Sequence, residues 1–170
     1  MRPCAIWLTG LSSTGKSSVA GELRALLLAR GVTPVQLDGD RLRAALPWPT
    51  GYERAERLDL ARLYGRLARE FVRQGHVVIC STVSLFHEVH AWNRAHIPGY
   101  VEVWLRAPEG ELELRDRAGR REVYTGGRGG AVVGLQLAPE FPLAPDLVID
   151  NHGATTPSAA ARRVLACCDV

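Results

Sequence analysis

Short apolar runs alternate along this chain with longer stretches in which apolar and polar positions follow a helical period. The short runs are largely continuous and often β-branched, which is typical of strands buried on both faces of a parallel sheet. We predict five such strands, at Ala5–Leu8, Val35–Leu37, Val77–Cys80, Tyr100–Leu105 and Leu147–Ile149. The longer stretches predict helices over 16–30, 53–74, 86–97 and 157–168, with a short one over 41–46. This alternation predicts an α/β fold in which helices cover both faces of a five-stranded parallel sheet.

Punctuation residues mark the ends of these elements. Gly31 follows the first predicted helix and suits a left-handed cap, and Thr156-Pro157 is a favourable start for the last one. The stretch 117–145 is different, because it holds several glycines and three prolines before the chain returns to the last strand. We predict one domain over residues 1–170 with a mobile lid at about 115–145.

Composition narrows the classes of partner. Apolar residues make up 46% of the 170 residues, enough for a proper core, and the net charge is only +3. That charge is far from the basic bias of a nucleic-acid binder, and no apolar run approaches the roughly 20 residues of a membrane span. The four cysteines show no zinc spacing, and no signal peptide fits the N-terminus. We therefore expect a cytoplasmic protein that binds neither nucleic acid nor membrane.

A phosphate-binding loop follows the first predicted strand. The sequence Gly10-Leu11-Ser12-Ser13-Thr14-Gly15-Lys16-Ser17 matches G-x-x-x-x-G-K-[ST] and is followed directly by a helix. Backbone N–H groups of such a loop point at phosphate oxygens, the lysine reaches the outer phosphates, and the serine can bind Mg²⁺. The loop predicts the P-loop NTPase fold, with ATP bound by Gly10, Ser12, Ser13, Thr14, Gly15, Lys16, Ser17 and Ser18.

The carboxylates for phosphoryl transfer come after the second strand. The third strand runs into Ser81-Thr82 with no acid, and the chain has no N-K-x-D motif for reading guanine. Asp38-Gly39-Asp40 lies at the carboxyl end of the second strand, the edge where parallel sheets bind ligands. We expect Asp38 to act on Mg²⁺ with Ser17, and Asp40 to act on the acceptor as a base or orienting group. The competing interpretation is that Asp40 only caps the short helix that follows.

Arginines indicate an anionic acceptor. Arg57 lies one turn before Leu60 on the apolar stripe of its helix, where a cation needs an anionic partner. Arg43, one turn after Asp40, is its expected companion. A second basic cluster falls in the lid and can offset charge on the transferring group; its members are Arg115, Arg117, Arg120, Arg121 and Arg128. The sequence therefore predicts a small-molecule kinase. The histidines of the 86–97 helix are expected to be structural or solvated.

These residues together resemble the adenylylsulfate kinases, which phosphorylate the ribose 3′-hydroxyl of adenylyl sulfate. The resemblance covers nearly the whole chain. It rests on 8–12 leading into the phosphate loop, Leu37-Asp38-Gly39-Asp40 with Arg43, Gly51-Tyr52 with Arg57, Val83-Ser84, Val101-Glu102-Val103, and Arg115-Asp116 with Gly119. It implies that Arg43 and Arg57 bind the acceptor, that Tyr52 stacks on its base, and that Arg115 contacts ATP. It further implies that Val83, Ser84 and Val132 lie beside the acceptor, and it is compatible with a homodimer.

Several departures from the family pattern bear on the acceptor. The family's I-S-P reads Val83-Ser84-Leu85, and the asparagine expected three residues after Arg57 is Leu60. The lid lysine is missing, and the phenylalanine that would sandwich the acceptor adenine is Val132, a poor stacking partner. Two alternatives therefore stay open. One is a kinase for another nucleotide-like acceptor, such as the cytidine diphosphoramidate used by a relative of this family. The other is a switch that binds nucleotide without turnover.

Overall fold

The computed structural model describes residues 1–119, 123–124 and 132–168. Its core is a five-stranded, all-parallel sheet in the order β2-β3-β1-β4-β5. The strands are β1 (Cys4–Thr9), β2 (Val35–Asp38), β3 (Val77–Ser81), β4 (Tyr100–Arg106) and β5 (Leu147–Asp150). Each contains the apolar run that predicted it, so the α/β fold with a five-stranded parallel sheet is confirmed.

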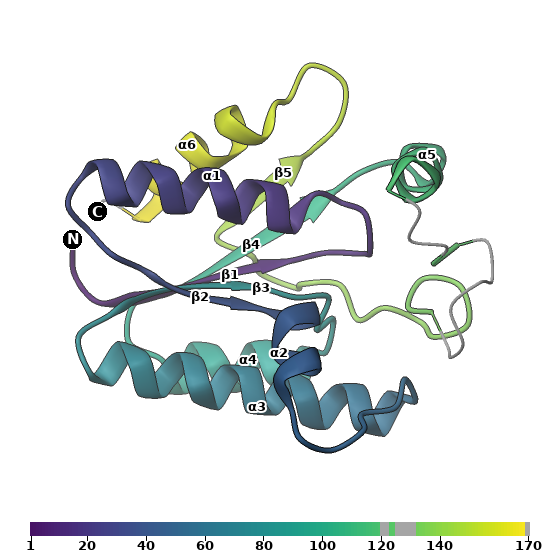
Figure 1. The fold of residues 1–170 in the computed structure, drawn as a ribbon, viewed down its shortest axis with the longest axis horizontal. Coiled ribbons are helices and arrows are strands. Elements are labelled where there is room, and N and C mark those ends of the chain that lie inside the picture. The colour runs from purple at the N-terminus through teal and green to yellow at the C-terminus, as the bar shows by residue number, and fades with distance from the viewer. Residues whose placement is uncertain (120–122, 125–131, 169–170) are drawn as a thin grey trace.

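Helices cover both faces of this sheet. They are α1 (Lys16–Ala29), α2 (Gly39–Ala45), α3 (Arg54–Arg73), α4 (His87–His96), α5 (Glu109–Ala118) and α6 (Pro157–Cys168). Helices α1 and α6 lie together on one face, and α3 and α4 lie on the other, while α5 stands at one end of the sheet (Figure 1). The result is the three-layer arrangement that a parallel sheet requires.

The central strand divides the core in two. Ile6 and Leu8 of β1 point to the layer of α1 and α6, whereas Ala5 and Trp7 point to the layer of α3 and α4, and all four are fully buried. Strands β2 and β3 lie on one side of β1, and β4 and β5 lie on the other, so the strand order reverses at β1. That switch point is where open α/β sheets bind ligands.

The predicted helix ends are found where the punctuation residues stand. Gly31 follows α1 with φ +75°, and its N–H donates to the Leu28 carbonyl at 2.9 Å. The Thr156 hydroxyl accepts from the Ala159 N–H at 3.1 Å and so caps α6. The short helix differs from expectation in its cap. Asp38, not Asp40, caps α2, because its carboxylate accepts from the N–H groups of Asp40 and Arg41.

Helix α5 was not predicted from the sequence. Of its side chains only Leu112 and Asp116 are buried, so it lacks the apolar stripe that reveals a helix. Ion pairs one turn apart support it instead, between Glu111 and Arg115 at 2.9 Å and between Glu113 and Arg117 at 3.7 Å. The first residues of the predicted lid therefore belong to this helix.

The lid is described only in part. Arg120, Arg121 and Arg128 and glycines 126, 127, 129 and 130 lie outside the described residues. A tight turn over 132–137 carries a bridge between Val133 and Leu137. After it, the Glu140 N–H donates to the Leu85 carbonyl at 3.2 Å, and the Glu140 carboxylate accepts from the His87 N–H at 2.8 Å and pairs with Arg54. The returning segment is thereby fixed to the start of α4.

No helix in the described ranges combines the length and apolarity that crossing a membrane requires. Cys4 and Cys80 are buried and pack as apolar side chains in the two halves of the core. Burial raises the pKa of the Cys80 thiol, with the Asp38 carboxylate adding to the effect, so this thiol stays protonated.

Glu140→Gln should lower stability in a pH-dependent way. Burial alone would raise the pKa of Glu140, but the His87 N–H and the Arg54 guanidinium outweigh it and hold the pKa below its ordinary 4.5. A lowered folded pKa means that the stabilisation is present above about pH 4.5 and is lost as the pH falls through the folded value. We expect a loss of about 1 kcal/mol at pH 7, or about 2–4 °C in Tm, that shrinks below about pH 4.5.

The measurement is thermal unfolding of both proteins from pH 7 to pH 3.5. Glu113→Gln is the matched control, because Glu113 faces Arg117 in an exposed pair and should change Tm by less. A Tm difference for Glu140→Gln that does not vary with pH would contradict the assignment.

Candidate active site

The phosphate loop connects β1 to α1 with a backbone that few residues can adopt. Gly10, Ser13 and Gly15 have positive φ values of 146°, 61° and 89°. A Cβ at Gly10 would collide with the carbonyl oxygen of Leu105. The conformation therefore requires the motif glycines and leaves the loop concave toward the start of α1.

Lys16 lies within this loop. Its Nζ donates to the carbonyl oxygens of Gly10 at 2.9 Å and Leu11 at 2.6 Å, while its side chain lines the cavity beside the loop. The ammonium group is thus held at the loop's inner edge, where the outer phosphates of a nucleotide would lie.

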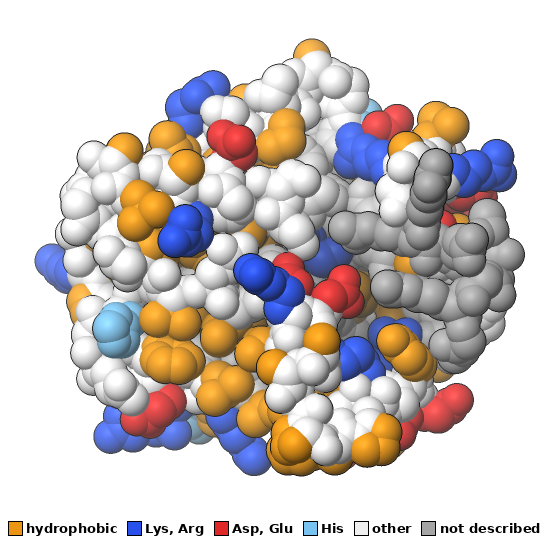
Figure 2. Space-filling model, in the orientation of Figure 1, with side chains coloured by type: hydrophobic (Ala, Val, Ile, Leu, Met, Phe, Trp, Pro, Cys, Tyr) orange, Lys and Arg blue, Asp and Glu red, His pale blue; other side chains and the backbone are white. Residues whose placement is uncertain are grey.

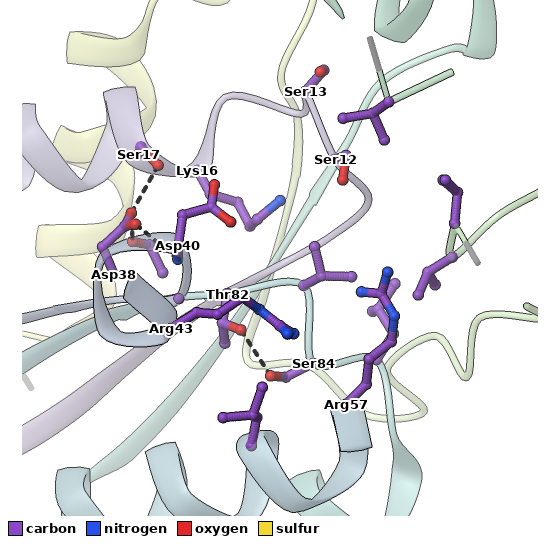
Figure 3. Close-up of a pocket in the computed structure, with 18 of the residues that line it drawn as sticks. Ser12, Ser13, Lys16, Ser17, Asp38, Asp40, Arg43, Arg57, Thr82 and Ser84 are labelled. Atoms are coloured by element: carbon purple, nitrogen blue, oxygen red, sulfur yellow. Dashed lines mark hydrogen bonds between the residues drawn. The ribbon is translucent and has the colours of Figure 1, made fainter. Parts of the chain in front are cut away.

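The Asp38 carboxylate is the meeting point of four donors. Its Oδ2 accepts from the hydroxyls of Ser17 and Ser81, each at 2.9 Å (Figure 3). Its Oδ1 accepts from the N–H groups of Asp40 at 3.1 Å and Arg41 at 3.3 Å. One side chain therefore joins α1, β3 and α2, and holds the Ser17 hydroxyl next to a carboxylate.

Asp40 lies two residues after Asp38 and lines the same cavity. The turn that carries it is supported by Tyr64 of α3, whose hydroxyl donates to the Gly39 carbonyl at 3.1 Å. Burial, opposed by nearby Arg43, raises the pKa of Tyr64 to about 12, so the hydroxyl stays a donor. Asp40 is exposed to the cavity, as a group that must meet a ligand should be.

Arg43 and Arg57 lie on either side of the path from α2 to α3. Arg43 donates to the carbonyl and hydroxyl of Thr50 and to the Gly51 carbonyl, at 2.7 to 3.1 Å. Arg57 donates from Nε to the Tyr52 carbonyl at 2.7 Å. Both guanidinium carbons lie over the Tyr52 ring, at 4.6 and 5.1 Å from its centroid.

Two cations held this close favour an anion between them. Burial and the charge of Arg43 lower the pKa of Arg57, and Tyr52 and Glu53 oppose this only in part. A guanidinium stays charged even so, and a phosphate or sulfate group would relieve the repulsion. In Figure 3 both side chains reach into the cavity from the side opposite the phosphate loop.

Apolar and small polar groups form the rest of this side. The Ser84 and Thr82 hydroxyls are 2.8 Å apart, and the Val83 carbonyl accepts from the Thr9 hydroxyl at 2.7 Å. Val132 is 8% exposed and lies in the turn whose Gly134 packs against Leu11 of the phosphate loop. The side predicted to hold the acceptor therefore has walls of Val83, Ser84 and Val132.

The lid contributes Arg115 and Tyr124. Arg115 lies on α5, lines the cavity and donates from Nε to Glu111 at 2.9 Å. The Tyr124 hydroxyl donates to the Ser12 carbonyl at 2.9 Å, and its N–H donates to Asp116. This connects the described part of the lid directly to the phosphate loop.

One cavity of about 380 Å³ brings nearly all the predicted site residues together. Figure 2 shows acidic and basic side chains gathered beside a hollow near α2. Of the predicted residues, those that line the cavity are Ser12, Ser13, Gly15, Lys16, Ser17, Ser18, Asp38, Asp40, Arg43, Tyr52, Arg57, Val83, Ser84, Arg115 and Val132. Gly10 and Thr14 are buried in the loop behind them and do not line it.

Sequence reasoning missed several supporting residues. Asn151, directly after β5, is buried and donates from Nδ2 to the Thr14 carbonyl of the phosphate loop at 2.7 Å. The rule that strand ends carry site residues would have selected both Asn151 and Ser81. Tyr64 falls within the predicted 53–74 helix, and a buried tyrosine hydroxyl needs a partner, but the sequence does not show which one. No sequence signal marks Tyr124.

Asn151→Ala should weaken nucleotide binding. The change leaves the buried Thr14 carbonyl without its donor and opens space beside Gly15, so the loop loses its fixed shape. We expect the KM for ATP to rise about tenfold in steady-state assays. Asn151→Asp keeps the shape of the side chain but removes the donor, so it should do at least as much harm. Wild-type ATP KM in the aspartate variant would show that this hydrogen bond does not matter.

Comparison with known proteins agrees with this geometry. A sequence model of the family described as "Adenylylsulphate kinase" matches residues 2–150. A probable adenylyl-sulfate kinase of Bacillus subtilis is 31% identical over 155 residues, covering 88% of this chain and 76% of that protein. A cytidine diphosphoramidate kinase of Campylobacter jejuni is 34% identical over 149 residues, covering 88% and 86%.

Solved structures give the same result. The Mycobacterium tuberculosis APS kinase in complex with AMPPNP and APS superposes with a TM-score of 0.86 and 29% identity, covering 99% of both chains. The family match spans the phosphate loop, the Asp38–Asp40 turn and both arginines. The chain is a phosphotransferase that uses a hydroxyl acceptor, and it belongs to the adenylylsulfate kinase family.

Proposed function

We propose that this enzyme transfers the γ-phosphoryl group of ATP to a hydroxyl of adenylyl sulfate or of a similar anionic nucleotide. The observation that carries the proposal is one continuous cavity with a phosphate loop at one end and Arg43 with Arg57 at the other. Asp40 lies between these ends. A site built this way fits two anionic ligands with the reacting groups in the middle.

The donor half of the proposal rests on the loop. Its N–H groups and the N-terminus of α1 suit the phosphates of ATP, and Lys16 can turn from the loop carbonyls toward the outer phosphates. Arg115, which lines the cavity from α5, adds positive charge from the lid side. The M. tuberculosis relative, whose structure holds AMPPNP and APS, is consistent with two ligands in one cavity.

The residues present fit a magnesium ion. The Ser17 hydroxyl lies 2.9 Å from Asp38, and oxygen ligands of this kind suit Mg²⁺, which takes its remaining ligands from phosphates and water. The described residues contain no group of three or more His, Cys, Asp or Glu that could hold a metal. When bound, Mg²⁺ would offset charge on the transferring phosphate. Ser17 would bind it directly, and Asp38 would orient Ser17 and its waters.

The acceptor half of the proposal states where the proton of the acceptor hydroxyl goes. The acceptor hydroxyl oxygen attacks the γ-phosphorus, a new P–O bond forms, and the bond to the ADP oxygen breaks. Asp40 accepts the proton that the hydroxyl loses. Arg43 and Arg57 hold the acceptor's anionic group, and Tyr52, Ser84 and Val132 surround its base. Lys16 and Arg115 balance the charge that collects on the departing ADP.

A second acceptor is favoured by one observation. Where the family resemblance expects an aromatic ring against adenine, the cavity has Val132, and Leu60 replaces a polar side chain nearby. These changes remove a stacking surface and a hydrogen-bonding group, which weakens the case for adenine in particular. The cytidine diphosphoramidate kinase among the relatives makes that compound the specific alternative.

Three further proposals rest on the family resemblance and on general chemistry. We propose that the chain is a single domain, that it forms a homodimer, and that it works in the cytoplasm, where ATP is supplied. One cooperative unfolding transition would support the first, light scattering of the purified protein measures the second, and localisation of a tagged chain measures the third.

The acceptor can be identified by acceptor-stimulated ADP release. Adenylyl sulfate and cytidine diphosphoramidate are supplied in parallel with ATP and Mg²⁺, and Lys16→Ala serves as the inactive control. We expect one of the two to stimulate ADP release at least tenfold over the rate without acceptor. If neither does so while ATP still binds, both named acceptors are excluded, and the same result with other anionic nucleotides would overturn the proposed function.

Asp40→Asn should slow the chemical step without weakening ATP binding. The amide keeps the shape of the carboxylate but cannot accept the hydroxyl proton, so kcat should fall by about 10²- to 10³-fold. The KM for ATP should stay within about twofold, because Asp40 lies beyond the phosphates. Asp59→Asn, an exposed aspartate of α3 paired with Arg62, is the matched control. A change confined to ATP KM would remove Asp40 from the acceptor side.

A further inference from the structure

A second polar cluster lies behind the acceptor side of the cavity. His90 of α4 and Glu102 of β4 have side chains only 7% and 3% exposed, and Arg94 and Asp146 complete the group at its outer edge. Burying charged groups is costly unless they bind one another. The cluster lies directly behind Ser84, so it can hold in place the residues that line the acceptor side of the cavity.

His90 bridges the acceptor side to the sheet. Its Nε2 lies 2.9 Å from the carbonyl oxygen of Ser84, and a carbonyl can only accept, so Nε2 carries the hydrogen and donates it. Its Nδ1 lies 3.0 Å from Oε1 of the Glu102 carboxylate, a contact that becomes an ion pair only when the ring is protonated. Nε2 therefore ties the ring to the acceptor side of the cavity, while Nδ1 faces the sheet through Glu102.

Glu102 is fixed in its turn. Its Oε2 pairs with Arg94 at 3.1 Å, and its backbone N–H donates to Asp146 at 2.7 Å. Arg94 also pairs with Asp146 and donates to the Ala144 carbonyl at 3.0 Å. The Asp146 hydrogen bond leads the effects that raise the pKa of Arg94, against some loss from burial. The cluster thus joins α4 and β4 to the segment that returns from the lid, and it is a rigid support for His90.

Ser84 is held by this support and by Thr82. The Thr82 hydroxyl lies 2.8 Å from the Ser84 hydroxyl, while His90 donates to the Ser84 carbonyl. Ser84 is 7% exposed, and the segment from Val83 to Leu85 lines the cavity. Without His90 the buried carbonyl would lack its donor, and the segment would shift to find another.

We propose that His90 is a positioning residue for the acceptor: through the Ser84 carbonyl it sets where the 83–85 wall of the cavity stands. The inference rests on the proposed function in one respect, that the acceptor binds against this wall. His90 does not line the main cavity and does not touch the phosphate loop. Its effect should therefore fall on the acceptor and leave the nucleotide alone.

The test compares two neutral amides at position 90. In His90→Gln the side-chain amide can reach the place of Nε2 and donate to the Ser84 carbonyl, whereas in His90→Asn it is too short. Neither amide carries a charge, so neither can form an ion pair with Glu102, and only the amide of His90→Gln reaches the Ser84 carbonyl. Steady-state kinetics with the acceptor identified by ADP release should give an acceptor KM about tenfold higher for His90→Asn, with unchanged ATP KM. His90→Gln should stay within about threefold of the wild type.

The controls distinguish an error in the role of His90 from an error in the proposed acceptor site. His96→Asn, an exposed histidine stacked on Trp92 at the end of α4, should leave both KM values unchanged. Equal acceptor KM values for the two amides at position 90, or a parallel rise in ATP KM with His90→Asn, would overturn the inference. Arg57→Ala tests the site itself. If it raises the acceptor KM and His90→Asn does not, only the role of His90 is wrong; if neither does, the proposed acceptor site is wrong.

Discussion

The Asp38 carboxylate is the interaction on which the site depends. It ends β2, caps α2, and accepts from the Ser17 hydroxyl of α1 and the Ser81 hydroxyl of β3. With four donors on two oxygens, the side chain has no freedom to turn, and each element is fixed relative to the others. Asp40 and Arg43 follow on α2, so their positions are set by the same carboxylate. Asp38 therefore sets the positions of Asp40 and Arg43 relative to the start of α1.

The sequence predicted the donor half because its signals are local. A strand, the phosphate loop and a helix are contiguous in the chain, and each glycine in the loop has a backbone reason to be there. The five strands were equally readable, since strands buried on both faces are continuous apolar runs. Helix α5 was not, because it is held by ion pairs between polar side chains and shows no apolar period.

The contacts of the supporting residues could not be read, because their partners are distant in the chain. Asn151 contacts Thr14, and Tyr124 contacts Ser12, across more than a hundred residues. Tyr64 and His90 were predicted as parts of helices, but which carbonyl each would meet depends on how α3 and α4 pack on the sheet. A period of 3.6 residues shows which face of a helix is buried, but it does not show which polar group that face will contact.

The two halves of the cavity are therefore constrained differently. At positions 10 and 15 the loop has backbone geometry that only glycine can adopt without a clash, so the sequence of the donor site can vary little. The acceptor wall is held by side chains that contact one another, Thr82 with Ser84 and His90 with Glu102, and is lined by Val132 and Leu60. Replacing such side chains reshapes the wall without touching the loop. A family can therefore keep ATP as its donor and the same phosphoryl transfer while its acceptors diverge. In this enzyme, the side chains of the acceptor wall determine which acceptor binds.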